Sequence, residues 1–538
     1  MASPAYPTIS PPDPRQRRRA TGLAGLLGVG ALGVVLALVQ SDLFDLDRHA
    51  AAKELALHLT ALLGLVVLLP RWRRVEAGAV EVLLAAFLAW SAVTALLATN
   101  HWLAFRSWSL TFSGVVIFLM AREAARQGRG RMVAAGLAFA AVIGALTGLA
   151  QAYGLDWSLL AGERAPGGTF GNRNFMAHLL AIALPLVALV TLEAEHRWAR
   201  ALGLAGSGLI AAAVVLTRSR AAWLAMGASL AVIGLALLVI RRAADRPVLA
   251  RRPAGLLAAL ALGTGLALLL PNRLEWKSDS PYAESLKGIV NYQEGSGHGR
   301  LIQYRNTLGL VARDPVFGVG PGNWMVRYPQ VTTPGDPSFG GADPIPTNPW
   351  PSSDWMAFWA ERGMVGVLLL LGAGLAAAVT AWRRLHQPGQ ALASVALLGC
   401  LTAAMVAGLF DAVLLLAAPT LFVFAAVGAL LPPSGTVVAV PLRRRRAALA
   451  ATSLVALLVV LRSVGELTAI ALTSQGRQRA VLERASQFDP GNHRLHLYLA
   501  MRGSCAQRLP HARAARRLLP FHDWPRRAAA ACGETTGS

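Results

Sequence analysis

The residues best suited to chemistry in this chain are arginines and asparagines beside glycine-rich turns. The segment 167–179, GGTFGNRNFMAHL, places Asn172 and Asn174 at the start of an apolar run, where they can cap a helix. His178 follows Asn174 by four residues and would share its helix face. A helix N-terminus offers unpaired N–H groups to an anion. A plain loop with a helix cap explains the same residues, and the segment alone leaves both interpretations open.

Two arginines stand between adjacent apolar runs in LTRSRAAWL, residues 216–224. Cationic side chains are costly near hydrocarbon, so their presence there indicates a function by default. For Arg218 an equally good explanation is that its long side chain snorkels to the lipid headgroups. Arg220 begins the next apolar run, and we expect it to point into the helix bundle.

A long polar stretch, 295–329, carries a third cationic position. Arg300 opens an amphipathic helix there, with Tyr304 and Leu308 on the same face. The glycine-rich run that follows, DPVFGVGPGN, predicts an irregular turn and no dinucleotide site, because no strand–helix unit surrounds it. Further along, Glu361 enters another apolar run, where it either marks the membrane interface or faces the bundle.

Apolar runs of membrane-spanning length must position these residues. The chain has 538 residues, of which 55% are hydrophobic and only 15% are charged, which is unlike the composition of soluble domains. Runs of about 17–25 apolar residues match a hydrocarbon core of about 30 Å. We therefore predict an all-α fold, a polytopic transmembrane helical bundle of about 12–13 spans. The predicted spans are 21–40, 54–70, 77–97, 107–121, 132–153, 174–192, 200–216, 220–240, 253–270, 356–380, 391–410, 412–431 and 447–470.

The net charge of +23 indicates membrane topology rather than a nucleic-acid partner. Alternate connections between the spans hold 24 Lys and Arg residues, against seven in the opposite short loops. By the positive-inside rule, this bias places the N-terminus in the cytoplasm. The connection 271–355, between spans 9 and 10, and the tail from about 473 then lie outside.

The chain divides into four predicted parts. They are a proline-rich, disordered cytoplasmic segment 1–20, a transmembrane domain 21–431 that contains the outward loop 271–355, a basic linker with the last span 432–472, and a small helical tail 473–538.

The tail has two features of its own. The residues DPGN at 489–492 separate two amphipathic stretches, which looks like a tetratricopeptide helix pair, although at most one and a half repeats fit. Cys505 and Cys532 could form a disulfide if the tail lies in an oxidising compartment. Cys400 lies within a predicted span, where a small buried hydrophobe is expected.

Four motifs in this order resemble the O-antigen ligase family. They are GTFGNRNFMAHLLAIALPL, TRSRAAWL, GRLIQYRNTLGLVARDPVFGVGPGN and, after the large outward loop, AERGMVGVLLLL. The resemblance covers roughly residues 80–431. It implies transfer of a glycan from an undecaprenyl diphosphate carrier to an acceptor at the outer face of the bacterial inner membrane. Members of the family include lipopolysaccharide ligases, which use lipid A-core as acceptor, glycan polymerases and O-linked protein glycosyltransferases.

The resemblance also implies roles for particular residues. It assigns Arg220 and Arg300 to the diphosphate, and an arginine fork suits phosphate oxygens because it binds them bidentately and stays charged. Asn172 and Asn174 would close around the same headgroup. No metal or other cofactor is implied, because arginines can stabilise the leaving group.

One departure from the family pattern concerns proton transfer. Where the family has a His-Asn pair before the tenth span, this chain has Ser352 and Ser353. A serine hydroxyl is no general base at neutral pH, so other groups must be considered for that role. The candidates are His178, which we favour, then His298, Asp354 and Glu361.

The same departure keeps other functions open. A missing histidine favours a non-catalytic binder of the lipid-linked glycan, whereas the retained Arg220 and Arg300 favour an enzyme. A transporter on the same scaffold would show charged groups in both leaflets, but the arginines named here lie at one face.

Overall fold

Long apolar helices dominate the structure, as the composition predicts. The computed structural model describes residues 14–41, 47–68, 74–160, 164–240, 246–276, 278–291, 295–336, 338, 349–387, 389–432, 435–439 and 441–534. Within these residues, 11 helices are long and apolar enough to cross a membrane, and two shorter apolar helices, Pro253–Leu269 and Ala417–Leu430, accompany them. Each of the thirteen predicted spans coincides with one of these helices.

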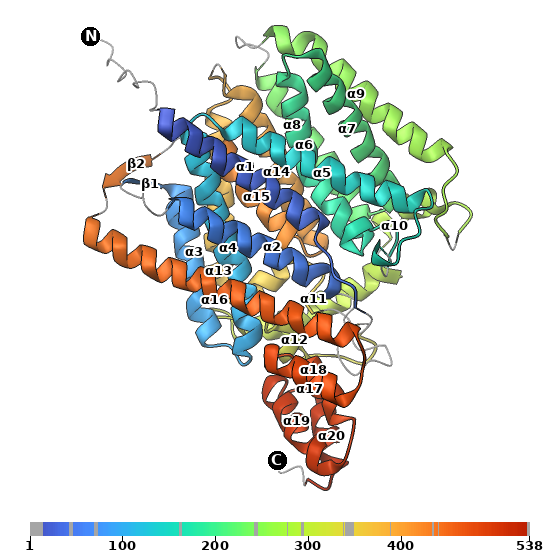
Figure 1. Cartoon of the computed structure of the whole chain (residues 1–538). Coiled ribbons are helices and arrows are strands. Elements are labelled where there is room, and N and C mark those ends of the chain that lie inside the picture. The colour runs from blue at the N-terminus through green and yellow to red at the C-terminus, as the bar shows by residue number, and fades with distance from the viewer. Residues whose placement is uncertain are drawn as a thin grey trace.

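The helices of the bundle are shown in Figure 1. They are α1 (Pro14–Leu36), α2 (Asp47–Leu68), α3 (Ala79–Leu96), α4 (His101–Arg126), α5 (Gly130–Ala152), α6 (Arg173–Glu193), α7 (Arg197–Thr217), α8 (Arg220–Ile240), α9 (Arg246–Leu269), α13 (Asp354–Arg383), α14 (Ala391–Phe410), α15 (Ala417–Leu430) and α16 (Leu442–Ser474). Because α1 begins at Pro14, residues 14–20 are helical although we predicted them in the disordered segment. Residues 1–13 lie outside the described part.

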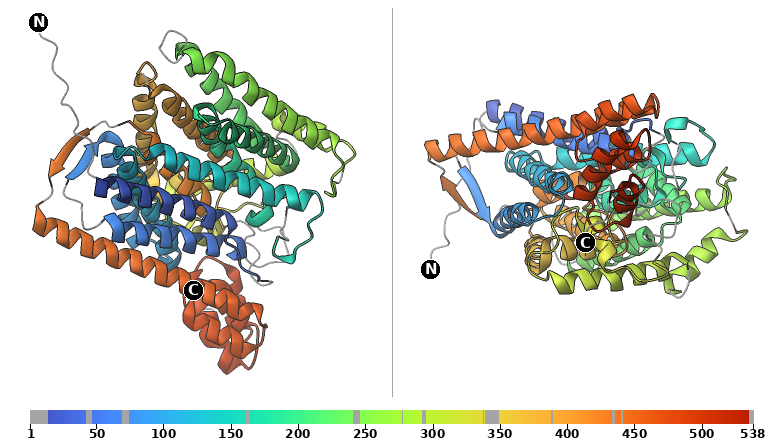
Figure 2. Two further views of the ribbon diagram at one scale, coloured as in Figure 1. Left: turned by 45° about the horizontal axis from the view of Figure 1, so that its top comes forward. Right: turned by 90° about the horizontal axis from the view of Figure 1, so that it is seen from below.

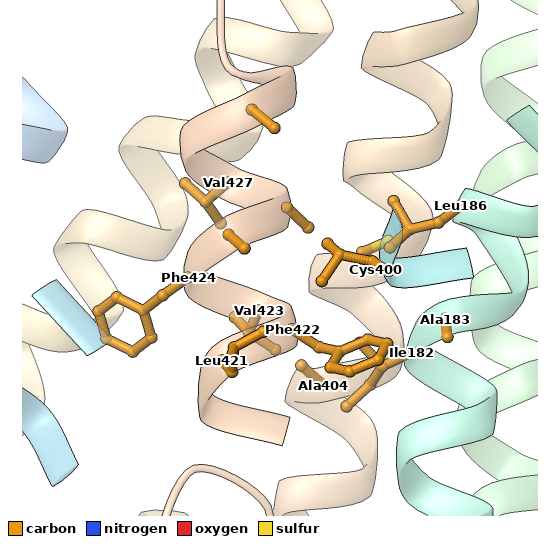
Figure 3. Close-up of a cluster of buried hydrophobic side chains, with 14 of the residues drawn as sticks. Ile182, Ala183, Leu186, Cys400, Ala404, Leu421, Phe422, Val423, Phe424 and Val427 are labelled. Carbon is orange, nitrogen blue, oxygen red and sulfur yellow. The ribbon is translucent and has the colours of Figure 1, made fainter. Parts of the chain in front are cut away.

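The centre of the bundle is made by α6, α14 and α15. Figure 3 shows side chains from these three helices in one cluster, among them Leu186, Cys400 and Phe422. All three are buried, so Cys400 is the small buried hydrophobe that the sequence predicts. Helix α6 contacts α5, α7, α8 and α14. Its N-terminal end, which carries the glycine-asparagine motif, is therefore held by many neighbours.

One end of the bundle carries the two strands found in the described residues. Strand β1 (Arg74–Gly78) pairs antiparallel with β2 (Gly435–Ala439), with Arg74 opposite Ala439. Near this ribbon, Arg122 pairs with Glu81 at 3.0 Å and donates to the Pro432 carbonyl at 3.2 Å. The strands are a small departure from the predicted all-α fold, and they join segments that are far apart in the sequence.

The other end of the bundle collects the polar connections. It contains the 3₁₀ turns η2 (Ser158–Leu160), η3 (Gly168–Phe170) and η4 (Tyr328–Gln330) and the helices α10 (Pro281–Val290), α11 (Gly295–Arg313) and α12 (Trp324–Arg327). Asn100, the N-cap of α4, receives a hydrogen bond from Asn323 to its carbonyl at 3.0 Å and donates its N–H to the Asn323 amide oxygen at 2.7 Å. The segments predicted to lie on one side of the membrane are thus in contact with one another.

The tail forms two helix pairs at the end of α16, as Figures 1 and 2 show. Its helices are α17 (Arg479–Phe488), α18 (His493–Ala500), α19 (Cys505–Leu518) and α20 (Asp523–Ala530). The helix break predicted at 489–492 is confirmed, and a disulfide joins Cys505 to Cys532 as the sequence suggested. A tetratricopeptide identity for these pairs stays a prediction.

The tail is docked on the end of the bundle that carries the polar connections. The indole N–H of Trp102 donates to Asp489 at 2.7 Å, and a ring nitrogen of His522 lies 3.0 Å from the Met325 carbonyl oxygen. Leu497 and Leu519 pack in one apolar cluster with Trp324. These contacts fix the tail against the start of α4 and the loop between α11 and α13.

Candidate functional site

The glycine-asparagine segment is a tightly packed turn that starts α6. Gly171 has a φ of 65°, and a Cβ added there would lie 2.2 Å from the His49 ring. The Gln151 side-chain oxygen accepts two backbone N–H groups of the segment, each at 2.9 Å. The Asn172 side chain accepts the N–H of Asn174 at 2.9 Å and so caps α6, as predicted. Close packing and left-handed backbone explain the glycines here.

Asp411 brings two of the predicted site residues together. The Asn174 amide donates to one Asp411 oxygen at 3.2 Å, and an Arg300 guanidinium nitrogen lies 3.9 Å from the same oxygen. The other Asp411 oxygen accepts the N–H of Ala412 at 2.9 Å. We call Asn174, Arg300 and Asp411 the polar cluster. It joins the start of α6, the start of α11 and the α14–α15 loop.

The ion pair in the polar cluster is loose. At 3.9 Å, the nitrogen–oxygen separation exceeds hydrogen-bond distance. The Arg300 side chain is 20% exposed and that of Asp411 is 13% exposed, so the cluster is accessible from outside the protein. Within the described residues no hydrogen bond occupies the Arg300 guanidinium, which leaves its donors available to a ligand.

His178 lies one helical turn from Asn174, on the side of the bundle interior. It is fully buried, with one ring nitrogen 3.5 Å from the Ser219 hydroxyl. The other ring nitrogen has no hydrogen-bond partner among the described residues. His178 is therefore four residues from Asn174, a member of the polar cluster, but its side chain does not contact solvent.

Helix α11 is held against the positions where the family has His-Asn. The Tyr304 hydroxyl bridges two backbone carbonyls, that of Ser352 at 2.5 Å and that of Leu409 at 2.9 Å. The Ser352 N–H donates to Gln303 at 2.7 Å, while its hydroxyl makes no hydrogen bond within the described part of the chain. Ser352 thus lies one turn of α11 from Arg300, and its half-buried hydroxyl is unused.

The next two residues have structural roles. Ser353 caps α13, and its hydroxyl donates to the Gly408 carbonyl at 3.0 Å. The buried carboxylate of Asp354 accepts the N–H groups of Val413 at 2.9 Å and Leu414 at 2.7 Å. Both oxygens of Asp354 are therefore engaged in holding the loop that carries Asp411.

Glu361 lies away from the polar cluster. It is buried, pairs with Arg362 at 3.2 Å and lies 3.4 Å from the N–H of Trp324. Nearby, Gly363 has a φ of 65° and breaks the helical geometry of α13, and a Cβ there would lie 1.9 Å from the Val316 carbonyl oxygen. The AERG motif and the glycine-rich turn 314–323 thus lock together. The prediction that this turn is structural agrees with these contacts.

Both arginines of the TRSR turn contact α10. Arg220 donates to the Gly288 carbonyl, and the Nε of Arg218 donates to the Ser285 hydroxyl at 2.9 Å. Arg218 has a φ of 54° and stacks over the Trp276 ring at 4.6 Å. Partial burial lowers the pKa of Arg218 from the ordinary arginine value, and the nearby Glu284 opposes this shift. Arg220 is thus held beside α10, on a different element from Arg300.

Two of the other candidates do not join this cluster. His298, on the first turn of α11, is exposed. Asn172 uses its side-chain oxygen as a helix cap.

Sequence reasoning missed Asp411. The available signal was a single acid in the apolar run AGLFDAVLLL, between the predicted spans 391–410 and 412–431, because ionisable groups in such runs are functional by default.

Comparison with known proteins agrees with the motifs. Residues 205–371 match the family model described as O-antigen ligase, a range that contains Arg220, Arg300, Ser352 and Glu361. A search of curated proteins found no match. The match lies over the α7–α8 turn, the outward loop and the first half of α13, which are the elements that carry three of the four motifs. The chain is therefore a polytopic membrane protein whose residues 205–371 are similar to the O-antigen ligase family.

Proposed function

We propose that this protein transfers a glycan from an undecaprenyl diphosphate carrier to an acceptor at the outer face of the bacterial inner membrane. The match of residues 205–371 to the O-antigen ligase model supports glycan transfer of the ligase or polymerase type in general. The acceptor that we propose is lipid A-core, and a growing glycan or a protein is the alternative within the family. The N-terminus would then lie in the cytoplasm and the tail outside, as the arginine distribution predicts.

The observation that carries this proposal is the loose pairing of Arg300. A guanidinium that is 3.9 Å from its carboxylate and 20% exposed can bind phosphate oxygens with little rearrangement. Arg220, from the α7–α8 turn, would supply the second cation. Negative charge grows on the diphosphate as it leaves, and fixed cations stabilise that charge most in the transition state.

The transfer step needs one proton acceptor. The acceptor hydroxyl oxygen forms a bond to the anomeric carbon of the donor sugar, and the bond from that carbon to the diphosphate oxygen breaks. The electron pair of that bond leaves with the diphosphate, and the hydroxyl proton passes to a base. We assign the proton to Asp411, because it lies beside Arg300 and is partly exposed. His178 is the second candidate, and its full burial makes it the weaker one.

A transfer assay with purified protein tests the role of Arg300. The donor is an undecaprenyl-diphosphate glycan, and the acceptor is lipid A-core. Replacement of Arg300 by Ala should lower transfer about 10²-fold or more, since loss of a charge partner costs about 2–5 kcal/mol. The matched control is Arg305→Ala, an exposed arginine on the same helix, which should retain activity. Full activity in Arg300→Ala would refute the diphosphate model.

The same assay separates the candidate bases. Asp411→Asn should lower transfer strongly, whereas His178→Ala and Ser352→Ala should reduce it less. If His178→Ala abolishes transfer and Asp411→Asn does not, the proton assignment is wrong although the diphosphate model stands.

Ser352 favours a second candidate function, that of a non-catalytic binder of the lipid-linked glycan. This position lacks the histidine of the family, and a serine there cannot act as a base. Binding of the lipid diphosphate that depends on Arg300, without transfer to any acceptor by the wild type, would support the binder.

A further inference from the structure

A large cationic cavity lies beside the α7–α8 turn. Its volume is about 820 Å³, and its walls include Arg164, Arg173, Arg218, Arg273 and Trp276. These residues come from the loop before α6, the start of α6, the end of α7 and the segment after α9. None of them belongs to the polar cluster, and the mechanism proposed above does not use them.

The charges in this cavity are not balanced. Four arginines face two carboxylates, Glu275 and Glu284. In the described residues, no nitrogen of these arginines lies within 4.0 Å of a carboxylate oxygen, whereas Arg122 and Arg131 at the other end of the bundle have partners at 3.0 Å and 2.7 Å. A cavity with this excess of fixed positive charge attracts an anionic ligand.

The arginines are also held in a set orientation. Trp276 contacts the guanidinium of Arg218 at 4.6 Å and that of Arg173 at 5.5 Å. Stacking on a ring engages the face of a guanidinium and leaves its edge N–H donors free to bind oxygen atoms. The Nε of Arg173 is buried and has no hydrogen-bond partner in the described part of the chain.

Arg218 is held there at a cost in backbone energy. It is the only residue other than glycine with a positive φ among those described. Such a conformation is strained for a residue that carries a side chain, and it persists where the surroundings require it. Here the left-handed backbone ends α7, and the side chain lies over Trp276 with its Nε on Ser285.

Size and chemistry together define the ligand. A cavity of about 820 Å³ is in the range that small-molecule ligands fill and is far larger than one phosphate needs. Arginine edges bind the two oxygens of a carboxylate bidentately. Arg220, which we assign to the diphosphate, is two residues from Arg218. A sugar linked to that diphosphate would therefore lie close to the cavity.

We propose that this cavity binds a sugar that carries a carboxylate, as part of the glycan on the lipid carrier. The protein thereby prefers acidic glycans as donors. This inference rests on the proposed function and names the substrate class of the same reaction. The matched control for its test is Arg197, at the opposite end of α7, which stacks on its own neighbour Trp198 at 5.5 Å.

Binding of a free saccharide tests the cavity without transfer. The probes are a disaccharide that contains glucuronic acid and its neutral glucose analogue, each titrated into the full chain in lipid nanodiscs. The acidic probe should bind at least about 10-fold more tightly than the neutral one, since hydrogen bonds between charged groups are stronger than those between neutral groups. Arg173→Gln and Arg218→Gln should remove this preference, Trp276→Leu should weaken it, and Arg197→Gln should leave it unchanged.

Three results would overturn the inference. They are equal affinity for the two probes, an acidic preference that survives in Arg173→Gln and Arg218→Gln, and displacement of the acidic probe by inorganic pyrophosphate at comparable concentration. The last would assign the cavity to the diphosphate of the carrier.

The variant Arg300→Ala separates this inference from the proposed function. It should lose transfer and still bind the acidic probe like the wild type. If the wild type transfers no glycan but keeps the arginine-dependent preference for the acidic probe, the proposed function fails and the saccharide site stands.

Discussion

Two arginines at the end of the bundle with the polar connections, Arg106 and Arg300, have carboxylate partners of very different geometry. Arg106 lies 2.9 Å from Glu54, 2.9 Å from Glu466 and 3.2 Å from Asp47. Arg300 has the single partner Asp411, at 3.9 Å. Both side chains are 20% exposed, so exposure does not distinguish them.

The difference lies in how fully each cation is satisfied. Three carboxylates engage the Arg106 fork from α2 and α16, and Arg462 adds a 2.7 Å bond to Glu466. Such a network holds helices together, and the loss of one member leaves buried charges unpaired. Arg300 keeps donors that its protein partner does not use. An arginine whose N–H donors are not all engaged by carboxylates is therefore a better indicator of a ligand site than one whose donors are engaged.

The largest predicted effect is on stability, at Arg106. Replacement of Arg106 by Leu leaves the buried Glu54 without its cationic partner and removes one of the two partners of Glu466, and it should cost about 3–5 kcal/mol. The measurement is the unfolding midpoint of the purified protein in denaturant, with Arg305→Leu as the control. Unchanged stability in Arg106→Leu would mean that the carboxylates around Arg106 do not make it a structural residue.

The opposite outcome is predicted at Arg300. Arg300→Ala should keep the wild-type free energy of unfolding to within about 0.5 kcal/mol, as surface substitutions do. Transfer should fall about 10²-fold or more, as argued above. If Arg300→Ala loses as much stability as Arg106→Leu, Arg300 is a structural residue like Arg106.

In the tail, the disulfide between Cys505 and Cys532 has a structural role like that of the Arg106 network. It closes a separation of 27 residues between Cys505 and Cys532, and such a cross-link typically contributes about 2–4 kcal/mol. A Cys505→Ser, Cys532→Ser variant should therefore expose the tail to protease at lower denaturant concentration. A reductant should have the same effect on the wild type and none on the variant; sensitivity of the variant to the reductant would point to another cause.

The smallest predicted effect is a pH dependence that arises from His493. This residue lines a cavity of about 120 Å³ together with Arg106. Burial lowers the pKa of His493 from 6.5 to about 3, with Arg494 and His522 acting in the same direction. Because the unfolded state binds the proton more readily, stability is full above pH 6.5 and falls as the pH drops toward 3. At pH 5.5 the loss is about 1.4 kcal/mol.

Denaturant unfolding at pH 7.5 and pH 5.5 measures this effect. The His493→Phe variant should lose the part of the pH dependence that comes from this residue, while transfer by folded protein should not change. An unaltered pH dependence in His493→Phe would assign the effect to other groups.

The sequence predicted the spans well because each is recognised by its own residues. Apolar runs such as 391–410 need no partner to be identified, and α14 has those bounds. The starts of helices were less accurate. Helix α4 begins at His101, six residues before the predicted 107, because Asn100 caps it in contact with Asn323. Such a boundary depends on a contact across more than 200 residues.

The candidate site was predicted only where a residue type carries the signal. Arg300 and Asn174 were recognised by residue type and by the resemblance of their motifs to the family, and the structure places them beside one carboxylate. That carboxylate, Asp411, was missed because its role depends on packing between α6, α11 and α14. Glu361 was grouped with the site because it lies in a motif, but its buried contacts belong to the join between α13 and the outward loop.

The docking of the tail has a consequence for the order of assembly. His493 and Arg494 line the cavity that also contains Arg106 and Glu361, and Asp489 bonds to Trp102. The ribosome makes these tail residues after all the membrane helices. In the topology that we propose, this end of the bundle is therefore incomplete while those helices insert, and it closes only after the tail has crossed the membrane. In pulse-chase experiments, the outward loop should become protease-resistant only after the tail has been exported.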